Sequence, residues 1–164
     1  MIKLIVLDVD GCLTDGKLTH DANGLESKSF NVKDGLGIST WIKMGNEVAI
    51  ITGKTSPMVT KRAQELGIKH VYQGIKDKKI VFKNILESLS IKHYEVAAIG
   101  DDLNDYNMLI NAGRSFTPNN GVKIIKSIVD TILPSSGGDG AVRDMINILV
   151  DENDQREAFL GVWR

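Results

Sequence analysis

The chain has 164 residues, 42% of them hydrophobic and 25% charged, and its formal net charge is −1. This length predicts one domain over residues 1–164 with a core large enough to fold alone, and the balanced charge offers no basic field for nucleic acid. No apolar run approaches the roughly 20 residues that cross a bilayer, the start lacks a signal-peptide pattern, and the single cysteine cannot close an intrachain disulfide, so we expect a cytoplasmic protein.

Short apolar runs rich in β-branched residues alternate along the chain with stretches of helical periodicity. This alternation predicts β-α-β units and an α/β fold built on a doubly wound parallel sheet. We expect strands over residues 2–7, 47–52, 70–74 and 95–101, and helices over 35–45, 56–67 and 77–90.

The second of these helices has the clearest ends, because Ser56 can cap it, Pro57 suits its first position and Gly67 can end it. The first and third helices carry apolar stripes at helical spacing, which we interpret as core faces. These stripes comprise Leu36, Ile38, Trp41, Ile42 and Met44 in the first helix and Ile80, Val81, Ile85, Leu86 and Leu89 in the third.

Two segments depart from the alternation of strands and helices. Residues 17–32 indicate two short strands around the turn sequence DANG, which form a hairpin inserted between the first strand and the first helix. Residues 151–164 indicate a polar tail that finishes in apolar side chains, and Trp163 within it could pack on a neighbouring subunit.

Two aspartates, Asp8 and Asp10, follow the first predicted strand in the stretch VLDVDGCLTDG. Ligands of open parallel sheets bind at the carboxyl ends of the strands. Like charges this close repel unless a cation neutralises them, and Mg²⁺ prefers oxygen ligands and keeps waters that a phosphate can replace. The pattern therefore predicts a site for magnesium and phosphate, and the alternative is an aspartate-rich turn that caps loop amides.

A second acidic cluster, Asp101, Asp102 and Asp105, follows the fourth predicted strand and leads into a predicted helix. Asp101 is the first polar side chain after that strand and Gly100, so we expect it to share a metal with the first cluster. Asp102 or Asn104 could instead be an ordinary helix N-cap.

Thr52 offers a hydroxyl at the end of the second predicted strand, and Lys76, Lys78 and Lys79 crowd the start of the third helix. An ammonium beside a metal and two aspartates can hold a phosphoryl oxygen, whereas most single lysines are simply solvated. The GKT within ITGKTSP is not a P-loop, because Val48 stands where that motif requires glycine.

DVDG, a downstream threonine, a lysine and then GDDLND follow one another in an order that resembles the haloacid dehalogenase-like phosphohydrolases. The resemblance covers nearly the whole chain and leaves no insertion large enough for a separate cap domain, so it implies a Rossmann-like sheet of the capless branch. Within this superfamily, DVDGCLTDG, FNVKDGLGI, ITGKTSP, LGIKHVYQG and GGDGAVRD resemble the 3-deoxy-D-manno-octulosonate 8-phosphate (KDO 8-phosphate) phosphatases of lipopolysaccharide sugar synthesis.

The resemblance implies a two-step phosphatase in which Asp8 is the nucleophile that takes the phosphoryl group. Asp10 would be the acid that protonates the leaving sugar oxygen and then the base that activates water. Thr52 and Lys78 would bind the transferring oxygens. The implied cofactor is Mg²⁺, held by Asp8, the backbone carbonyl of Asp10 and Asp101, with Asp102 and Asp105 supporting these ligands.

The resemblance also implies a sugar side to the pocket. Relatives that act on nonulosonate 9-phosphates carry an acidic residue at the position of Lys54, whereas a lysine favours the carboxylate of the eight-carbon sugar acid. A nonulosonate 9-phosphate is the alternative substrate. The implied substrate-binding residues are Asn31, Val32, Lys33, Asp34, Gly35, Lys54, Arg62 and Lys78.

A capless site is open to water, and in such relatives the hairpin and C-terminal tail of neighbouring subunits supply the missing walls. Leu18, Leu25, Phe30 and Val32 give the hairpin apolar side chains, so we expect a homotetramer, whereas in the alternative both segments fold onto their own domain. Two other function classes stay open. A receiver domain uses the same residue types in another chain order, and a relative without catalysis could be an oligomerisation or regulatory module.

Overall fold

A six-stranded parallel sheet forms the centre of the computed structural model, which describes residues 1–164. The strand order is β5-β4-β1-β6-β7-β8. The chain first adds β4 and β5 on one side of β1 and then adds β6, β7 and β8 on the other side. The strands are β1 (Leu4–Leu7), β4 (Glu47–Ile51), β5 (His70–Tyr72), β6 (Val96–Ile99), β7 (Arg114–Thr117) and β8 (Thr131–Ile132).

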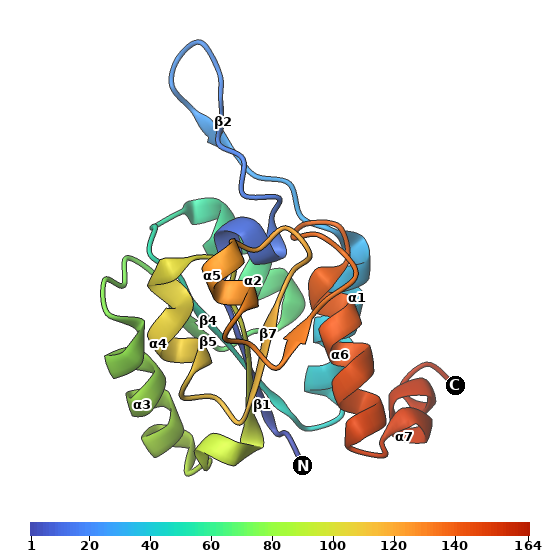
Figure 1. Ribbon diagram of the computed structural model, residues 1–164. Helices are drawn as coiled ribbons and strands as arrows, with labels where there is room; N and C mark the ends of the chain where they lie inside the picture. Colours follow the sequence, from blue (N-terminus) through green and yellow to red (C-terminus); the bar gives the residue numbers. More distant parts are fainter.

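Helices cover both faces of this sheet (Figure 1). Because β1 and β6 are buried on both faces, every residue in them is apolar, as is typical of central parallel strands. Short turns of helix lie at Val9–Leu13, His93–Glu95 and Leu103–Asp105. One face packs against α1 (Val32–Lys43), α2 (Pro57–Leu66), α6 (Ala141–Glu152) and α7 (Arg156–Gly161), and the other against α3 (Lys78–Leu89), α4 (Tyr106–Leu109) and α5 (Lys123–Lys126).

The four predicted strands and the three predicted helices are confirmed. The Ser56 side chain caps α2, and Gly67 ends this helix in the left-handed conformation. Helix α1 begins at Val32, earlier than predicted, because the Asn31 side chain caps it by accepting a hydrogen bond from the Lys33 N–H.

The prediction of a core face is wrong for two residues, since Leu36 is 47% exposed and Ile80 is 58% exposed. At about 100° per residue, Leu36 lies on the opposite side of α1 from Ile38, and Ile80 lies on the opposite side of α3 from Phe82. Ile38 and Phe82 are buried against the sheet. The spacing of apolar residues therefore predicted the helices correctly, but it assigned too many residues to their buried faces.

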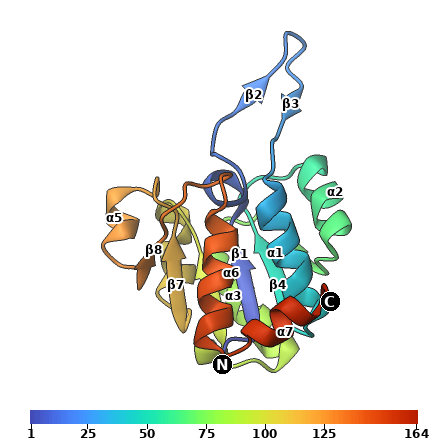
Figure 2. The same ribbon diagram turned by 90° about the vertical axis from the view of Figure 1, so that its right-hand side faces the viewer.

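The predicted hairpin is confirmed as β2 (Thr19–His20) and β3 (Glu26–Ser27), which pair antiparallel. It projects away from the carboxyl end of the sheet and stands clear of the body of the molecule (Figures 1 and 2). Leu18 and Leu25 are exposed as a result, to 55% and 68%, whereas Phe30 at the base of the hairpin packs against the core. The projecting part of the hairpin therefore does not fold onto its own domain.

The C-terminal tail does pack against its own chain. Helix α6 continues to Glu152, and α7 follows it with Phe159 buried. Trp163 Nε1 donates a hydrogen bond to Thr40 Oγ1 at 3.0 Å, and the Lys43 ammonium lies 4.4 Å from the centre of the Trp163 ring. Helix α7 lies at the end of the sheet opposite the hairpin (Figure 2).

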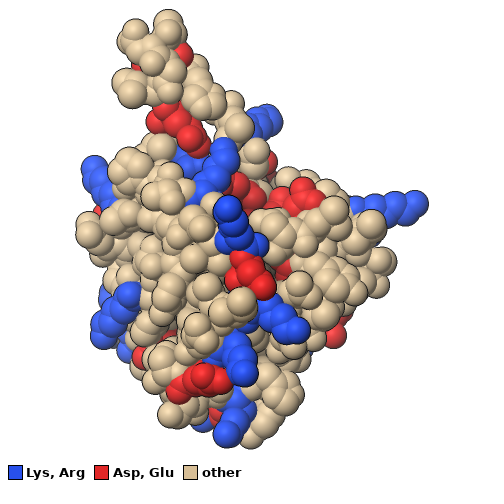
Figure 3. All heavy atoms as spheres, turned by 90° about the vertical axis from the view of Figure 1, so that its left-hand side faces the viewer, with Lys and Arg blue, Asp and Glu red and all other residues tan.

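The surface mixes both signs of charge. Basic and acidic side chains are interspersed on the face shown in Figure 3, and α3 carries one such pair, Lys83 and Glu87, at 3.7 Å. None of the helices combines the length and the hydrophobicity that a membrane-spanning segment needs.

Candidate active site

Three predicted site residues lie at the carboxyl end of the sheet. Asp8 follows β1, Thr52 follows β4, and Asp101 follows β6 after one glycine. The direction in which strands are added reverses between β1 and β6, and open α/β sheets bind ligands at such a switch point. Counting only the main sheet, the strand order is 3-2-1-4-5-6, whereas receiver domains have the order 2-1-3-4-5. The topology therefore excludes a receiver domain.

A buried lysine joins the two acidic clusters. Lys78 is the first residue of α3, and its Nζ lies 2.6 Å from Asp8 Oδ1 and 2.6 Å from Asp105 Oδ1. Its neighbours Lys76 and Lys79 are exposed. Of the three lysines that the sequence offered, Lys78 is thus the one whose charge is held inside the site.

The aspartates of this cluster are unfavourable as charged groups without further compensation. Burial and the nearby Asp105 raise the pKa of Asp8 well above its usual value, although Lys78 opposes the shift. Burial and Asp105 likewise raise the pKa of Asp101 to about 7. A cation bound between them would favour the charged forms, so the electrostatics of the site fit a divalent metal ion.

Asp8, Asp101 and Cys12 each offer one possible ligand atom, and these atoms lie within 4.8 Å of one another. Burial raises the pKa of the Cys12 thiol well above its usual value, so the thiol keeps its proton. Magnesium prefers oxygen ligands. The two carboxylates, not the sulfur, therefore fit a magnesium ion.

The close approach of Asp101 depends on a glycine in the loop after β1. Gly11 has a φ of +98°, and a Cβ atom at this position would lie 2.0 Å from Asp101 Oδ2. From the other side, Asp105 Oδ2 accepts a hydrogen bond from the Asp101 N–H at 2.9 Å. Asp102 is exposed and accepts a hydrogen bond from the Leu103 N–H at 2.7 Å, which confirms the N-cap alternative for it.

Asp8 and Asp101 line a polar hollow of about 280 Å³. Its volume lies just below the roughly 300–1,000 Å³ of typical ligand pockets, and no apolar side chain lines it. The lining residues are Asp8, Asp10, Gly16, Thr52, Gly53, Lys54, Asp101, Asp102 and Asn104.

Sequence reasoning missed Lys28, which follows β3 at the base of the hairpin. Its Nζ donates hydrogen bonds to Asp10 Oδ1 at 2.6 Å and to Glu26 Oε1 at 3.0 Å. The Lys28 side chain is 3% exposed. A lysine among polar hairpin residues gives no signal of its own, because only the folded chain brings it to Asp10.

The segment predicted to bind the sugar lies outside this hollow. Asn31 caps α1, and Lys33 is exposed. Asp34 is buried beside α6, where its Oδ1 accepts a hydrogen bond from the Arg143 N–H at 2.8 Å, and burial raises the pKa of Asp34 to about 6. Asp34 thus caps the first turn of α6 and does not line the pocket.

A separate shallow hollow is lined by Val32, Gly35 and Arg62 together with apolar residues of α1 and α2. Arg62 Nη2 donates a hydrogen bond to the Asn31 carbonyl at 3.4 Å, and a Cβ atom on Gly35 would lie 2.3 Å from that nitrogen. Of the predicted sugar-binding residues, Lys54 therefore shares a hollow with Asp8, whereas Arg62 does not.

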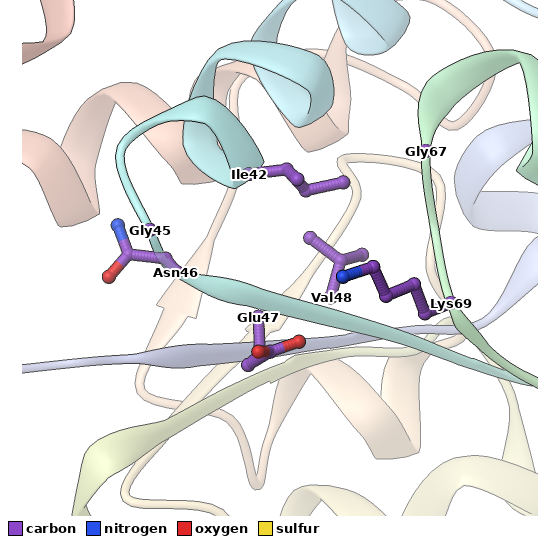
Figure 4. Close-up of a pocket in the computed structure, with 7 residues that line it drawn as sticks. All are labelled: Ile42, Gly45, Asn46, Glu47, Val48, Gly67 and Lys69. Carbon is purple, nitrogen blue, oxygen red and sulfur yellow. The ribbon is translucent and has the colours of Figure 1, made fainter.

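A further hollow, of about 160 Å³, opens at the amino ends of β4 and β5 (Figure 4). Its carboxylate, Glu47, already bonds to His70 Nε2 at 3.1 Å. This hollow lies at the opposite end of the strands from Asp8 and does not belong to the candidate site.

Comparison with known proteins agrees with this geometry. Residues 71–146 match the family described as haloacid dehalogenase-like hydrolases. The chain is 41% identical to the 3-deoxy-D-manno-octulosonate 8-phosphate phosphatase KdsC of Escherichia coli K12 over 149 residues, which are 91% of this chain and 79% of that protein. It is 35% identical to KdsC of Haemophilus influenzae over 158 residues, which are 96% and 88% of the two chains.

Solved structures give the same result. The crystal structure of 3-deoxy-D-manno-octulosonate 8-phosphate phosphatase from Moraxella catarrhalis, in complex with magnesium ion, phosphate ion and KDO, superposes with a TM-score of 0.95 at 38% identity, covering 99% of this chain and 94% of that one. The cobalt-bound enzyme from H. influenzae gives a TM-score of 0.88 at 37% identity, with 92% and 88% covered. The chain therefore belongs to the 3-deoxy-D-manno-octulosonate 8-phosphate phosphatase family of the haloacid dehalogenase-like hydrolases.

Proposed function

We propose that this chain is a Mg²⁺-dependent phosphatase that hydrolyses 3-deoxy-D-manno-octulosonate 8-phosphate to KDO and phosphate. The observation that carries this assignment is the cluster of Asp8, Lys78 and Asp101 at the switch point of a chain of this family. Phosphoryl transfer relies mainly on positioning and charge stabilisation, which suits so small a set of groups. The proposal includes a role in lipopolysaccharide sugar synthesis in the cytoplasm.

Asp8, the backbone carbonyl of Asp10 and Asp101 would hold the metal, while Asp102 and Asp105 would support their loop. The bound ion would screen the charge of the phosphate against an anionic nucleophile. The raised pKa values of Asp8 and Asp101 support this role, and so does the magnesium in the M. catarrhalis relative.

Asp8 is the nucleophile of the first step. One of its carboxylate oxygens bonds to phosphorus as the bond from phosphorus to the sugar oxygen breaks. Asp10 gives its proton to the departing oxygen, which leaves an aspartyl phosphate on Asp8 and a free sugar hydroxyl. Lys78, bonded to Asp8 Oδ1 at 2.6 Å, and Thr52, buried at the end of β4, would hold the transferring oxygens.

Asp10 acts as the base of the second step. It takes a proton from a water molecule whose oxygen bonds to phosphorus as the bond from phosphorus to Asp8 breaks. Phosphate leaves, Asp8 is a carboxylate again, and Asp10 carries the proton for the next cycle. Two displacements with low barriers thus replace one difficult attack by water.

The positive charge of Lys54 at the hollow favours a substrate with a carboxylate, as KDO 8-phosphate has. Because Val32, Gly35 and Arg62 line the separate hollow, we assign them to the sugar side of a neighbouring subunit's site. Asn31, Lys33 and Asp34 would then hold that segment of α1 in place.

A homotetramer of single-domain subunits completes the proposed function. The hollow that contains Asp8 lacks apolar walls, while Leu25 at the hairpin tip is 68% exposed. Burial of such side chains against neighbours would stabilise the hairpin and would shield the site from water. The hairpin flap, residues 17–32, would make these contacts, whereas the packing of Trp163 on Thr40 keeps the tail, residues 151–164, on its own chain. Sedimentation as a monomer at micromolar concentration would contradict the tetramer.

Phosphate release from KDO 8-phosphate and from N-acetylneuraminate 9-phosphate, measured side by side with Mg²⁺, tests the function. We expect preference for the eight-carbon substrate, abolished by Asp8→Asn. Preference for the nine-carbon substrate would keep the mechanism and change the substrate. No turnover of either ester would favour a module without catalysis and would overturn the proposed function.

A further inference from the structure

The Lys28 side chain is shielded from solvent at the base of the hairpin. This side chain is 3% exposed although Lys28 follows a short hairpin strand in which Glu26 is half-buried and Ser27 is exposed. Lysine side chains are almost never buried without a charged partner. Lys28 has two, because its Nζ lies 2.6 Å from Asp10 Oδ1 and 3.0 Å from Glu26 Oε1.

The contact with Asp10 uses one particular oxygen of that carboxyl group. Oδ1 accepts the hydrogen bond from Lys28, and no other group of the chain bonds to the Asp10 carboxyl. Asp10 is partly exposed, at 25%, on the lining of the polar hollow. Oδ2 is therefore the oxygen left to exchange a proton with a substrate or a water molecule.

We propose that Lys28 is a positioning residue for Asp10, which holds Oδ1 so that Oδ2 faces the departing sugar oxygen and carries the transferred proton. The inference rests on the proposed function and names a residue for it that no sequence motif indicated. A carboxylate on an unrestrained side chain samples several staggered rotamers, whereas a charge-assisted hydrogen bond selects one.

The same bond connects the hairpin to the chemistry. Lys28 reaches Asp10 from the strand end of the hairpin, and Glu26 of β3 holds the ammonium on its other side. A change in the hairpin's position would therefore move the Lys28 ammonium and with it the carboxyl group of Asp10. Capture of the hairpin by neighbouring subunits would fix this arrangement.

The test compares two phosphate esters that differ in their need for an acid. The sugar alkoxide of KDO 8-phosphate must be protonated as it leaves, whereas the p-nitrophenolate of p-nitrophenyl phosphate leaves without a proton. We use kcat/KM with Mg²⁺, since it reports on steps up to the first phosphoryl transfer. For Lys28→Met we expect a fall of about 10- to 100-fold on KDO 8-phosphate and of less than about threefold on p-nitrophenyl phosphate.

Lys83→Met is the matched control, because Lys83 is an exposed lysine of α3 outside the hairpin and the site. We expect this control to leave kcat/KM unchanged on both esters. We expect Lys28→Arg, which keeps the charge, to recover most of the wild-type ratio of kcat/KM on KDO 8-phosphate to kcat/KM on p-nitrophenyl phosphate. The mass of each variant is measured by light scattering so that loss of assembly is recognised. If Lys28→Met assembles poorly, Glu26→Gln, which loosens the Lys28 ammonium, is expected to shift the ratio in the same direction.

Equal losses of kcat/KM on both esters, or no loss on either, would overturn the role of Lys28 while leaving the phosphatase in place. The wild-type rate on KDO 8-phosphate is read first. Its absence would overturn the proposed function itself, so the two failures are distinguished in one series of assays.

Discussion

Replacement of Lys78 by methionine probes the buried charge cluster most severely. The Lys78 side chain is 1% exposed, and its Nζ lies 2.6 Å from a carboxylate oxygen of Asp8 and 2.6 Å from one of Asp105. At an effective dielectric constant of about 20, each pair attracts by about 6 kcal/mol before the desolvation of the charges is subtracted. Removal of one member of a buried ion pair typically destabilises a protein by about 3–5 kcal/mol, because the remaining charges lose their partner.

We therefore expect Lys78→Met to lower the free energy of unfolding by about 3 kcal/mol without metal and to lower kcat by at least about 10²-fold. Urea unfolding and phosphate release are the assays. Lys83→Met on the same helix is the matched control, since Lys83 is 76% exposed and its pair with Glu87 spans 3.7 Å; its effect should stay within about 0.5 kcal/mol.

Added Mg²⁺ should restore part of the stability of Lys78→Met, because a second cation at Asp8 and Asp101 compensates the same carboxylates. Equal stability of Lys78→Met and Lys83→Met, or a kcat of Lys78→Met close to that of the wild type, would refute this reasoning.

Three further changes test separate parts of the structure. Gly11→Ala should lower Mg²⁺-dependent activity by about 10-fold or more, since the alanine Cβ would lie 2.0 Å from Asp101 Oδ2. Gly45→Ala is the control and should leave this activity unchanged, because Gly45 also has a positive φ but has open space around it. The pKa of Asp34 rises from 3.8 to about 6 on folding, so the stability that this group contributes is present below pH 3.8 and is lost as the pH rises through 6. In urea unfolding, the free energy of unfolding of Asp34→Asn relative to the wild type should therefore increase by about 1–3 kcal/mol between about pH 4 and pH 7. A difference between the two proteins that stays constant with pH would contradict this. Leu25→Asp should dissociate the assembly in sedimentation velocity and reduce turnover; an unchanged mass would remove the hairpin from the interface.

Local signals in the sequence were sufficient for much of the fold. The ends of α2 could be predicted because Ser56, Pro57 and Gly67 determine them through their own backbone preferences. Strands β7 and β8 were not predicted, because RSFT and TI are short and lack a run of β-branched apolar residues. Their pairing depends on β6, which is already in place.

The candidate site likewise contains residues that local sequence signals predicted and residues that they did not. Asp8 and Asp101 were predicted to meet because each follows an apolar strand of one parallel sheet, and such strand ends share an edge. Lys28 and the capping of α6 by Asp34 depend on contacts between residues distant in the chain, with no periodicity or motif to mark them. Sequence patterns therefore indicated the residues that meet at the carboxyl ends of the strands better than the residues that hold them in place.

The central claim is that Asp8 carries the phosphoryl group between the two steps. The most direct measurement is acid quenching of Asp10→Asn during turnover of p-nitrophenyl phosphate with Mg²⁺, followed by peptide mass spectrometry, because p-nitrophenolate leaves without a proton from Asp10 while loss of the base slows the second step. We predict that the peptide containing Asp8 gains the mass of one phosphoryl group, and that the gain is absent from the double variant that also carries Asp8→Asn. Continued phosphate release with an unmodified Asp8, or phosphorylation of another residue, would contradict the account.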